Sequence, residues 1–278
     1  MKKIIYVICA LLVCVAALYL IAVPSVSYLK KTNPKKTALM EIREAQWAAK
    51  GGHRRVWQVW TPLAAISPYL VKAVVISEDD KFYEHDGFDF DAMKAAVEKD
   101  IKAGRFKAGG STISQQLAKN LFLAPDKSAL RKLREAVITW RLEQTLTKKR
   151  IIEIYLNVAE WGDGVFGAEA ASRHYFGKSA SELTPMEACR LAVVLPSPRR
   201  MNPAGDSDYV TRRAEFIYAI MLRRGIVEPE YEDTAVSPDD AAVDQVDAPV
   251  APSVPAADGA TDAPAPPLSG DGQGQRPL

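Results

Sequence analysis

Residues 67–78 read SPYLVKAVVISE, and this stretch sets the helical character of the body of the chain. Serine followed by proline is a typical helix start, with Ser67 at the N-cap and Pro68 at the first helical position. Three valines then share one helical face, and Glu78 is the next residue on that face. A carboxylate that points inward among apolar side chains should have a raised pKa, because desolvation disfavours its charged form. Such a group suits general acid or base chemistry near neutral pH, whereas the alternative is that the helix ends at Glu78 and the side chain turns to water.

Outward from this stretch the sequence predicts helix after helix as far as Ile226. Thr112 with Gln115, and Thr184 with Glu187, have the spacing of capping boxes at helix starts. Further helices are expected over 37–50, from Asp89 to about Gly104, from Ser128, from Thr147, and from about Asp208 to Gly225. On the helix after Ser128 one side carries Leu130, Leu133, Val137, Trp140 and Gln144. No run of alternating β-branched residues competes with the helical pattern, so we expect a mainly α body.

Charge is distributed unevenly along the 278 residues, although the formal net charge is only +2. From Glu228 to the end there are eleven acidic residues and one arginine, a net of −10, which leaves +12 on residues 1–227. A body this basic favours an anionic partner, whether nucleic acid, phosphate groups or an anionic membrane surface. Residues 232–278 are rich in Ala, Pro, Asp and Gly and hold too little apolar surface to offset their ordering entropy, so we predict a disordered tail.

The N-terminus carries a long apolar stretch. Residues 4–23 are uncharged and almost wholly apolar, which is long enough to span a bilayer as one helix. The small residues Ser25 and Ser27 leave cleavage open, but the length favours an uncleaved anchor over a signal peptide. Lysines flank the stretch on both sides, so charge alone does not favour an outside body. Cys189 is the only cysteine beyond this stretch, which excludes an internal disulfide framework in the body, and no Cys/His cluster has metal-ligand spacing.

Two clusters at helix ends could carry chemistry. The polar loop from Glu78 to Asp89 leaves an apolar helix, a usual place for catalytic groups, although an acidic cap for the next helix is the simpler explanation of its later residues. His85 in this loop is expected to be structural. The Gly109-Gly110 pair leads into a helix N-terminus, which can bind an anion through backbone N–H groups. Its polar residues also fit an ordinary amphipathic helix; they are Ser111, Thr112, Gln115, Gln116, Lys119 and Asn120.

Two further clusters follow. Lys127, Arg131 and Glu135 lie at the start of the helix after Ser128, where Arg131 and Glu135 have the spacing of an exposed ion pair. The other interpretation is a second carboxylate facing Glu78 across a cleft, because paired carboxylates serve reactions at an anomeric carbon and cations stabilise phosphates. The last cluster, 153–162, is explained by capping electrostatics at Glu153 and by close packing at its glycines.

Taken in order, these clusters resemble the peptidoglycan glycosyltransferases of family 51, over about Trp57 to Pro203. The motifs are Glu78-Asp79 with Phe82, His85 and Gly87; Gly109-Gly110-Ser111-Thr112 with Gln115, Gln116, Lys119 and Asn120; Arg131-Lys132 with Glu135; Tyr155-Leu156-Asn157; and Leu195-Pro196 with Pro198. Because the chain ends soon after Gly225, without room for a transpeptidase domain, it resembles the monofunctional biosynthetic members.

The resemblance implies a lysozyme-like helical fold with a membrane-facing jaw. It divides the chain into an anchor (1–27), a stalk or jaw entry region (28–66), the glycosyltransferase domain (67–227) and the acidic tail (228–278). It also implies polymerisation of lipid II, by transfer of the growing lipid-linked chain onto the 4-hydroxyl of lipid II with release of undecaprenyl diphosphate. The enzyme would lie in the bacterial inner membrane as a single-pass protein, with its catalytic domain on the periplasmic face.

The family's roles transfer to matching positions. Glu78 corresponds to the general base, and Glu135 to a second glutamate that assists the leaving group or holds a metal. Lys119, Lys127 and Arg131 face the diphosphate, and Gln115 and Gln116 line the donor cleft beside Ser111, Thr112 and Asn120. No cofactor is obligatory, although a divalent cation such as Mg²⁺ is often associated with the family. Expected partners are lipid II, the nascent strand, the membrane, and wall-synthesis or division proteins, but no nucleic acid.

Two positions depart from the family pattern. Asp80 adds negative charge beside Glu78, and Lys127 replaces a frequent arginine, so that a bidentate phosphate contact becomes a point-charge contact. Two alternatives remain open at this stage. One is a lytic enzyme of lysozyme-like fold that cleaves finished glycan, whose cleft would not need the cations. The other is an inactive scaffold, against which the intact acids argue.

Overall fold

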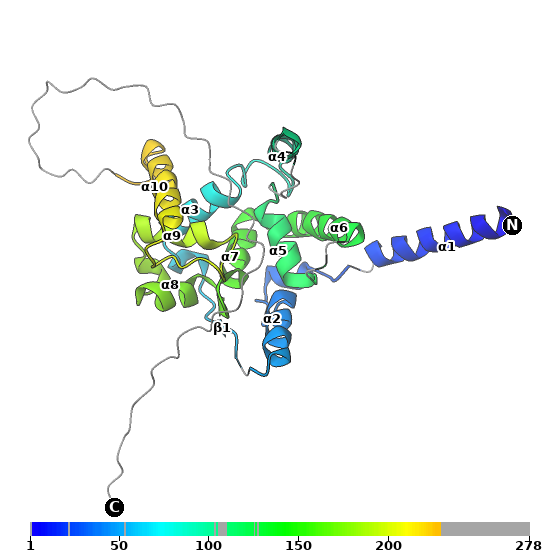
Figure 1. The fold of residues 1–278 in the computed structure, drawn as a ribbon, viewed down its shortest axis with the longest axis horizontal. Helices are drawn as coiled ribbons and strands as arrows, with labels where there is room; N and C mark the ends of the chain where they lie inside the picture. Colours follow the sequence, from blue (N-terminus) through cyan, green and yellow to red (C-terminus); the bar gives the residue numbers. More distant parts are fainter. Residues whose placement is uncertain are drawn as a thin grey trace, which may run out of the picture. The chain divides into compact units, whose positions relative to one another are not determined.

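The computed structural model describes residues 2–21, 23–52, 54–102, 104, 110–124, 126 and 128–228. The prediction of a disordered tail lies outside the described residues, apart from Glu228. Ten α-helices form within these ranges, which confirms the mainly α body (Figure 1). They are α1 (Lys2–Ile21), α2 (Ala38–Ala49), α3 (Pro68–Glu78), α4 (Phe90–Lys102), α5 (Ile113–Phe122), α6 (Ala129–Thr145), α7 (Lys148–Val158), α8 (Ala168–Phe176), α9 (Pro185–Val194) and α10 (Asp208–Arg223). Short 3₁₀ turns are η1 (Ser27–Lys30), η2 (Leu63–Ala65) and η3 (Ala180–Glu182).

A small sheet accompanies the helices, which the sequence did not predict. Its strands β1 (Trp57–Gln58), β2 (Glu160–Gly162) and β3 (Val165–Phe166) lie in the order β1-β3-β2. β1 runs parallel to β3, and β2 runs antiparallel to it. Strands of two or three residues are too short to show an alternating pattern of apolar residues. β1 also pairs with a segment about a hundred residues away, so no local pattern predicts this sheet.

The helix starts follow the predicted caps at most positions. Thr112 and Thr184 each close a capping box, and the side chains of Ser128 and Thr147 each accept a bond from the third residue of their helix. Ser67 is the exception. It occupies the N-cap position of α3, but its hydroxyl donates to the carbonyl of Leu183 (3.1 Å) instead of capping the helix.

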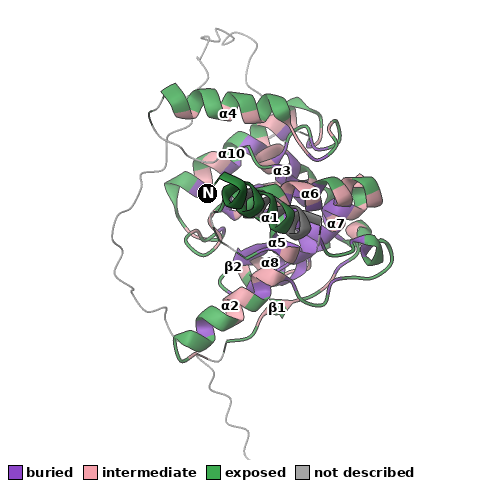
Figure 2. Ribbon diagram, turned by 90° about the vertical axis from the view of Figure 1, so that its right-hand side faces the viewer, coloured by how far each residue is buried: buried purple, intermediate pink, exposed green. Residues whose placement is uncertain are grey.

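The core forms where α5 meets its neighbours. α5 packs against α6 and α7, while α3 packs against α9, and α9 against α10. Figure 2 shows this region as predominantly buried. Fully buried side chains from these helices include Leu70, Val74, Ile113, Leu117, Ile138, Leu142, Ile154, Leu191 and Ile217. The site described below therefore stands on rigid, packed elements.

Residues before α3 also contribute to this packing. Leu29, Met40 and Trp47 are buried, and α2 packs against α5. The side chain of Asn157 on α7 accepts a bond from the Thr61 N–H (2.7 Å) and donates to the Thr61 carbonyl (2.8 Å). The segment between α2 and α3 is thus bonded directly to the helical body.

α4 and α6 are among the helices that expose apolar side chains. α4 buries none of its residues (Figure 2). Its exposed apolar side chains are Phe90, Val97 and Ile101. On α6 the apolar side predicted from the sequence includes the exposed Leu133 and Trp140, while Glu135 and Thr139 are buried on the side that meets the core. Among the described residues, no helix has the length and apolar character that a membrane crossing requires.

Candidate active site

Glu78 ends α3 with a half-buried side chain. Both sequence interpretations hold in part: the helix ends at this residue, yet its carboxylate turns toward the protein. The side-chain amide of Gln116 donates to Oε2 of Glu78 at 2.8 Å. Burial raises the pKa of Glu78 above its ordinary value, opposed by the bond from Gln116 and by the charges of Lys119 and Arg213, while Asp79 raises it further. With a raised pKa, the carboxylate of Glu78 takes up a proton more readily than an ordinary glutamate does, which suits a general base.

Asp79 fixes the loop that follows. Its carboxylate is buried and accepts bonds from the backbone N–H of Ile113 (2.9 Å) and from His85 Nε2 (2.8 Å). Nδ1 of His85 in turn accepts from the N–H of Gly87 (3.1 Å), so Nε2 carries the ring proton and donates. His85 thus has the structural role expected from the sequence. This network holds the residue next to Glu78 against the N-terminus of α5.

The start of α5 is fixed by its own side chains. The hydroxyl of Thr112 donates to the Gly87 carbonyl (2.7 Å), and Oε1 of Gln115 accepts from the Thr112 N–H (3.0 Å). Gln115 is buried and closes the capping box, so the structure places it in the helix start and not on the cleft surface where the resemblance puts it. Ser111 is exposed, and Gly109 lies outside the described residues.

Two cavities flank the bond between Gln116 and Glu78. The larger, of about 490 Å³, is lined among others by Glu78, Asp80, Ser111 and Thr112. The smaller, of about 260 Å³, is lined among others by Gln116, Lys119, Asn120, Tyr155, Arg43 and Glu160. The hydrogen bond therefore joins a residue that lines one cavity to a residue that lines the other.

Lys119 supplies a positive charge to the smaller cavity. Its side chain reaches solvent, yet the surrounding protein partly desolvates the ammonium group, and this lowers its pKa. The carboxylates of Glu135 and Glu78 oppose this effect, whereas Lys132 and Arg131 add to it. The charges of two acids and two cations therefore all act on Lys119. An anionic ligand bound there would be stabilised by Lys119 together with Arg131 and Lys132.

Glu135 on α6 is buried and paired on both oxygens. Oε2 accepts from Nη1 of Arg131 (2.7 Å), and Oε1 accepts from Nζ of Lys132. The predicted Arg131–Glu135 ion pair is present, but its carboxylate is buried instead of exposed. Lys127, also predicted to face a diphosphate, lies outside the described residues.

The residues described here do not fit a divalent metal. No three His, Cys, Asp or Glu side chains gather as a metal site would require within the described ranges. Glu135, the one residue expected to ligate, directs both oxygens to protein cations. The chemistry below therefore uses the chain's own residues.

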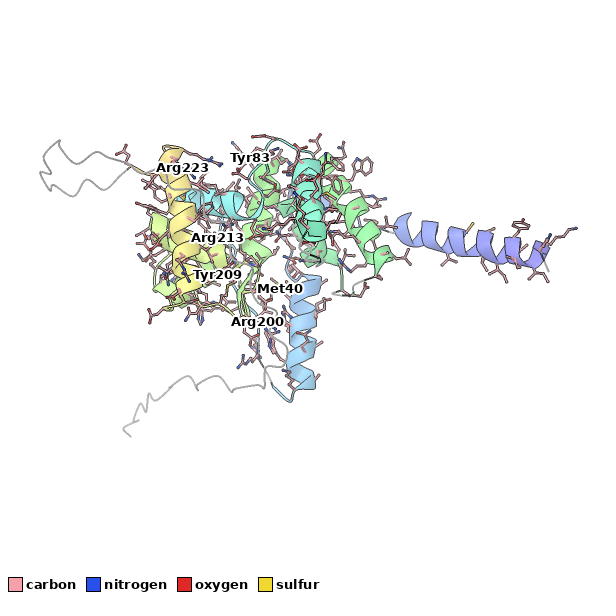
Figure 3. The ribbon with its side chains drawn as sticks, turned by 45° about the horizontal axis from the view of Figure 1, so that its top comes forward. Met40, Tyr83, Arg200, Tyr209, Arg213 and Arg223 are labelled. Carbon is pink, nitrogen blue, oxygen red and sulfur yellow. The ribbon has the colours of Figure 1, made fainter. Side chains whose placement is uncertain are left out.

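Several residues at the site were missed by sequence reasoning. Arg213 of α10, labelled in Figure 3, contributes positive charge at Glu78. Tyr155 of α7, a motif residue to which the sequence assigned no role, donates to Gln116. Asp80, expected to add negative charge beside Glu78, forms a two-fold ion pair with Arg224 (2.6 and 2.8 Å), so its charge is compensated. These partners come from distant parts of the sequence, so no spacing rule could have found them.

A half-buried glutamate with a raised pKa, at the end of a helix, beside a cavity and near several cations, is suited to acid or base chemistry at a glycosidic bond. The sequence profile of the family described as transglycosylase matches residues 44–222, and the chain belongs to this family.

Named relatives agree with this assignment. The biosynthetic peptidoglycan transglycosylase of Dechloromonas aromatica (strain RCB) is 50% identical over 189 residues, covering 68% of this chain and 82% of the relative. The protein of the same name from Aromatoleum aromaticum (strain DSM 19018 / LMG 30748 / EbN1) is 54% identical over 168 residues, covering 60% and 73%. The one from Chromobacterium violaceum is 45% identical over 218 residues, covering 78% and 96%.

Proposed function

We propose that this chain polymerises peptidoglycan glycan strands from lipid II. The observation that carries the proposal is the half-buried carboxylate of Glu78, bonded to Gln116 at 2.8 Å between the two cavities. An acceptor sugar in the larger cavity would present its 4-hydroxyl to Glu78. A lipid-linked donor in the smaller cavity would place its diphosphate near Lys119.

Side chains of this protein can account for each step of the proposed reaction. Glu78 takes the proton of the acceptor hydroxyl, and the oxygen forms a bond to the anomeric carbon of the donor. The bond from that carbon to the diphosphate breaks, and the undecaprenyl diphosphate leaves with the electron pair. The cations Lys119, Arg131 and Lys132 favour the negative charge that develops on this leaving group.

Glu135 is assigned a positioning role. Because it bonds to both Arg131 and Lys132, it holds these two cations in place near Lys119. Glu135→Gln would keep the volume of the side chain but loosen both ion pairs. We expect a weaker grip on the diphosphate, measured as a raised KM for lipid II.

The test of the leading proposal is polymerisation of purified lipid II. Glu78→Gln should lower polymer formation by about 10²–10⁴-fold, the usual contribution of a general base. Glu84→Gln, an exposed glutamate in the same loop, is the matched control and should polymerise as the native chain does. Intact polymerisation by Glu78→Gln would refute the general-base role. Release of muropeptides from isolated sacculi without added lipid precursor would favour the lytic alternative.

We propose also that the protein works at a membrane, anchored by the apolar stretch over residues 4–23, with its body on the periplasmic side of the inner membrane. Exposed apolar side chains on α4 and α6 support this location, since Phe90 is 72% exposed, Leu133 53% and Trp140 56%. Protease added to intact spheroplasts should digest the body of the chain. Protection of the body would contradict the proposed orientation.

A further inference from the structure

Three side chains from three helices form one hydrogen-bonded chain at the site. The hydroxyl of Tyr155 (α7) donates to Oε1 of Gln116 (α5) at 2.9 Å, and Nε2 of Gln116 donates to Oε2 of Glu78 (α3) at 2.8 Å. Tyr155 is only 1% exposed. Its hydroxyl therefore has few alternatives to this bond.

The direction of these bonds follows from their chemistry. An ionised carboxylate only accepts hydrogen bonds, so the NH₂ group of Gln116 must face Glu78. The amide oxygen then faces Tyr155, which must donate. Burial, and then the charges of Glu78 and Asp79, raise the pKa of Tyr155 well above its ordinary value, so the hydroxyl keeps the proton that it donates.

This arrangement distinguishes the two oxygens of Glu78. Oε2 accepts the bond from Gln116, which is the one hydrogen bond to this carboxylate among the described residues, so Oε1 is left to the acceptor. We propose that Tyr155 is a positioning residue, which fixes the amide of Gln116 so that Glu78 receives the acceptor proton on Oε1. The proposal rests on Glu78 being the base of the proposed function.

The proton balance of this step is simple. The proton passes from the acceptor hydroxyl to Oε1 of Glu78, while the bond from Gln116 to Oε2 stays in place. Tyr155 and Gln116 lose no proton. Without the tyrosine hydroxyl only the carboxylate of Glu78 orients the amide of Gln116, so the amide turns over more readily. Its oxygen would then face Glu78 and favour the protonated carboxyl, which cannot act as a base.

The test is the pH dependence of polymerisation by the full-length Tyr155→Phe protein. The rate falls as pH falls through the pKa of the base. This fall is the acidic limb of the pH–rate profile. We expect the limb to move to higher pH by about 0.5–1 unit, the size expected for the loss of one ordinary hydrogen bond. Tyr175→Phe is the matched control, since it removes a hydroxyl that donates to the Trp161 carbonyl (3.1 Å), and its limb should stay where the native limb lies.

A second variant makes the test specific. Gln116→Met removes the amide, and it should also move the acidic limb to higher pH. Tyr155→Phe added to it should cause no further move, because the tyrosine acts through the amide. The proposal would be overturned if the acidic limb of Gln116→Met, or of a folded Tyr155→Phe, lay at the same pH as in the native protein. It would also be overturned if Tyr155→Phe shifted the limb of the double variant by as much again. Should Tyr155→Phe fail to fold, the limb of Gln116→Met still decides. Glu78→Gln tests the general-base role separately, because polymerisation by this variant would refute that role.

Discussion

Glu78 is held at the end of α3 against two unfavourable effects, desolvation and the negative end of the helix. The bond from Gln116 and the charges of Lys119 and Arg213 compensate only in part, since the pKa of Glu78 stays above its ordinary value. The carboxylate that makes the site reactive should therefore also make the fold less stable.

Replacement of Glu78 by glutamine should stabilise the protein at neutral pH. A folded-state pKa above the unfolded value means that the native chain loses stability as pH rises through that pKa, and glutamine does not titrate. Because the side chain is only half-buried, we expect a gain of about 1 kcal/mol at most, or a few degrees in Tm. Thermal melts from pH 8 downward check this. The difference should disappear as pH approaches 4.5, the ordinary value for glutamate, and a Tm below native at pH 8 would contradict it.

Gly87 is a second position where one residue decides the local geometry. Its φ is +92°, and an added Cβ would lie 2.9 Å from both Glu143 Cγ and Thr139 Cγ2. Gly87→Ala should cost about 2–4 kcal/mol, the sum of left-handed strain and overpacking. Gly51→Ala is the control, because Gly51 also has a positive φ (+74°) but no atom within 4 Å of an added Cβ. Urea unfolding should show a smaller loss there, about 1–2 kcal/mol, and equal losses would contradict the packing argument.

At the scale of elements, α5 joins the parts of the site. Its N-terminus is bonded to Asp79 and Gly87, its middle carries Gln116, and its last turn carries Lys119. A shift of this helix would move the partner of Glu78 and the cation together. Stability of the helix start should therefore affect activity as well as folding.

The two capping boxes separate these effects. Thr112→Ala and Thr184→Ala each remove the cap side chain of a complete capping box, on α5 and α9. In denaturant unfolding, loss of the cap should cost about 1 kcal/mol in Thr184→Ala, and about 2–3 kcal/mol in Thr112→Ala, which also leaves the Gly87 carbonyl without its buried partner. Only Thr112→Ala also removes the bond to Gly87 (2.7 Å), so only it should lower lipid II polymerisation, by severalfold. An equal loss of activity in both variants would show that destabilisation alone is responsible.

The same elements show what the sequence could and could not predict. Caps depend on local sequence, so Thr112 and Thr184 could be assigned from capping-box spacing, and Ser128 and Thr147 from their place before an apolar helical pattern. Glu78 could be placed on an inward face by helical period. The bond of Tyr155 to Gln116 and the pairing of Asp80 with Arg224 join residues 39 and 144 positions apart, and only packing of the whole body sets such contacts. Gln115 was assigned to the cleft by resemblance, although its capping spacing already pointed to the helix start.

On the scale of the whole molecule, the exposed apolar side chains of α4 and α6 should act at the membrane surface. Phe90→Ser and Trp140→Ser should lower polymerisation of lipid II embedded in vesicles, by severalfold, and leave activity on detergent-solubilised lipid II close to native. Phe216→Ser is the control, since Phe216 is similarly exposed (44%) but lies on α10. Equal losses in vesicles and detergent would indicate misfolding or a direct substrate contact instead.

Asn157 has a practical consequence for recombinant production. Its side-chain amide hydrogen-bonds to the backbone of Thr61 and donates to the Glu153 carbonyl. The backbone carbonyl of Asn157 accepts from the side chain of Gln58. A shortened protein that begins at Ser67 would leave this buried amide without the backbone of Thr61 and would uncover the face of α5 on which α2 packs. Such a fragment should precipitate on expression, whereas one that begins at Val23 should remain folded and suit crystallisation. The helical body therefore has its natural starting point well upstream of its first catalytic helix.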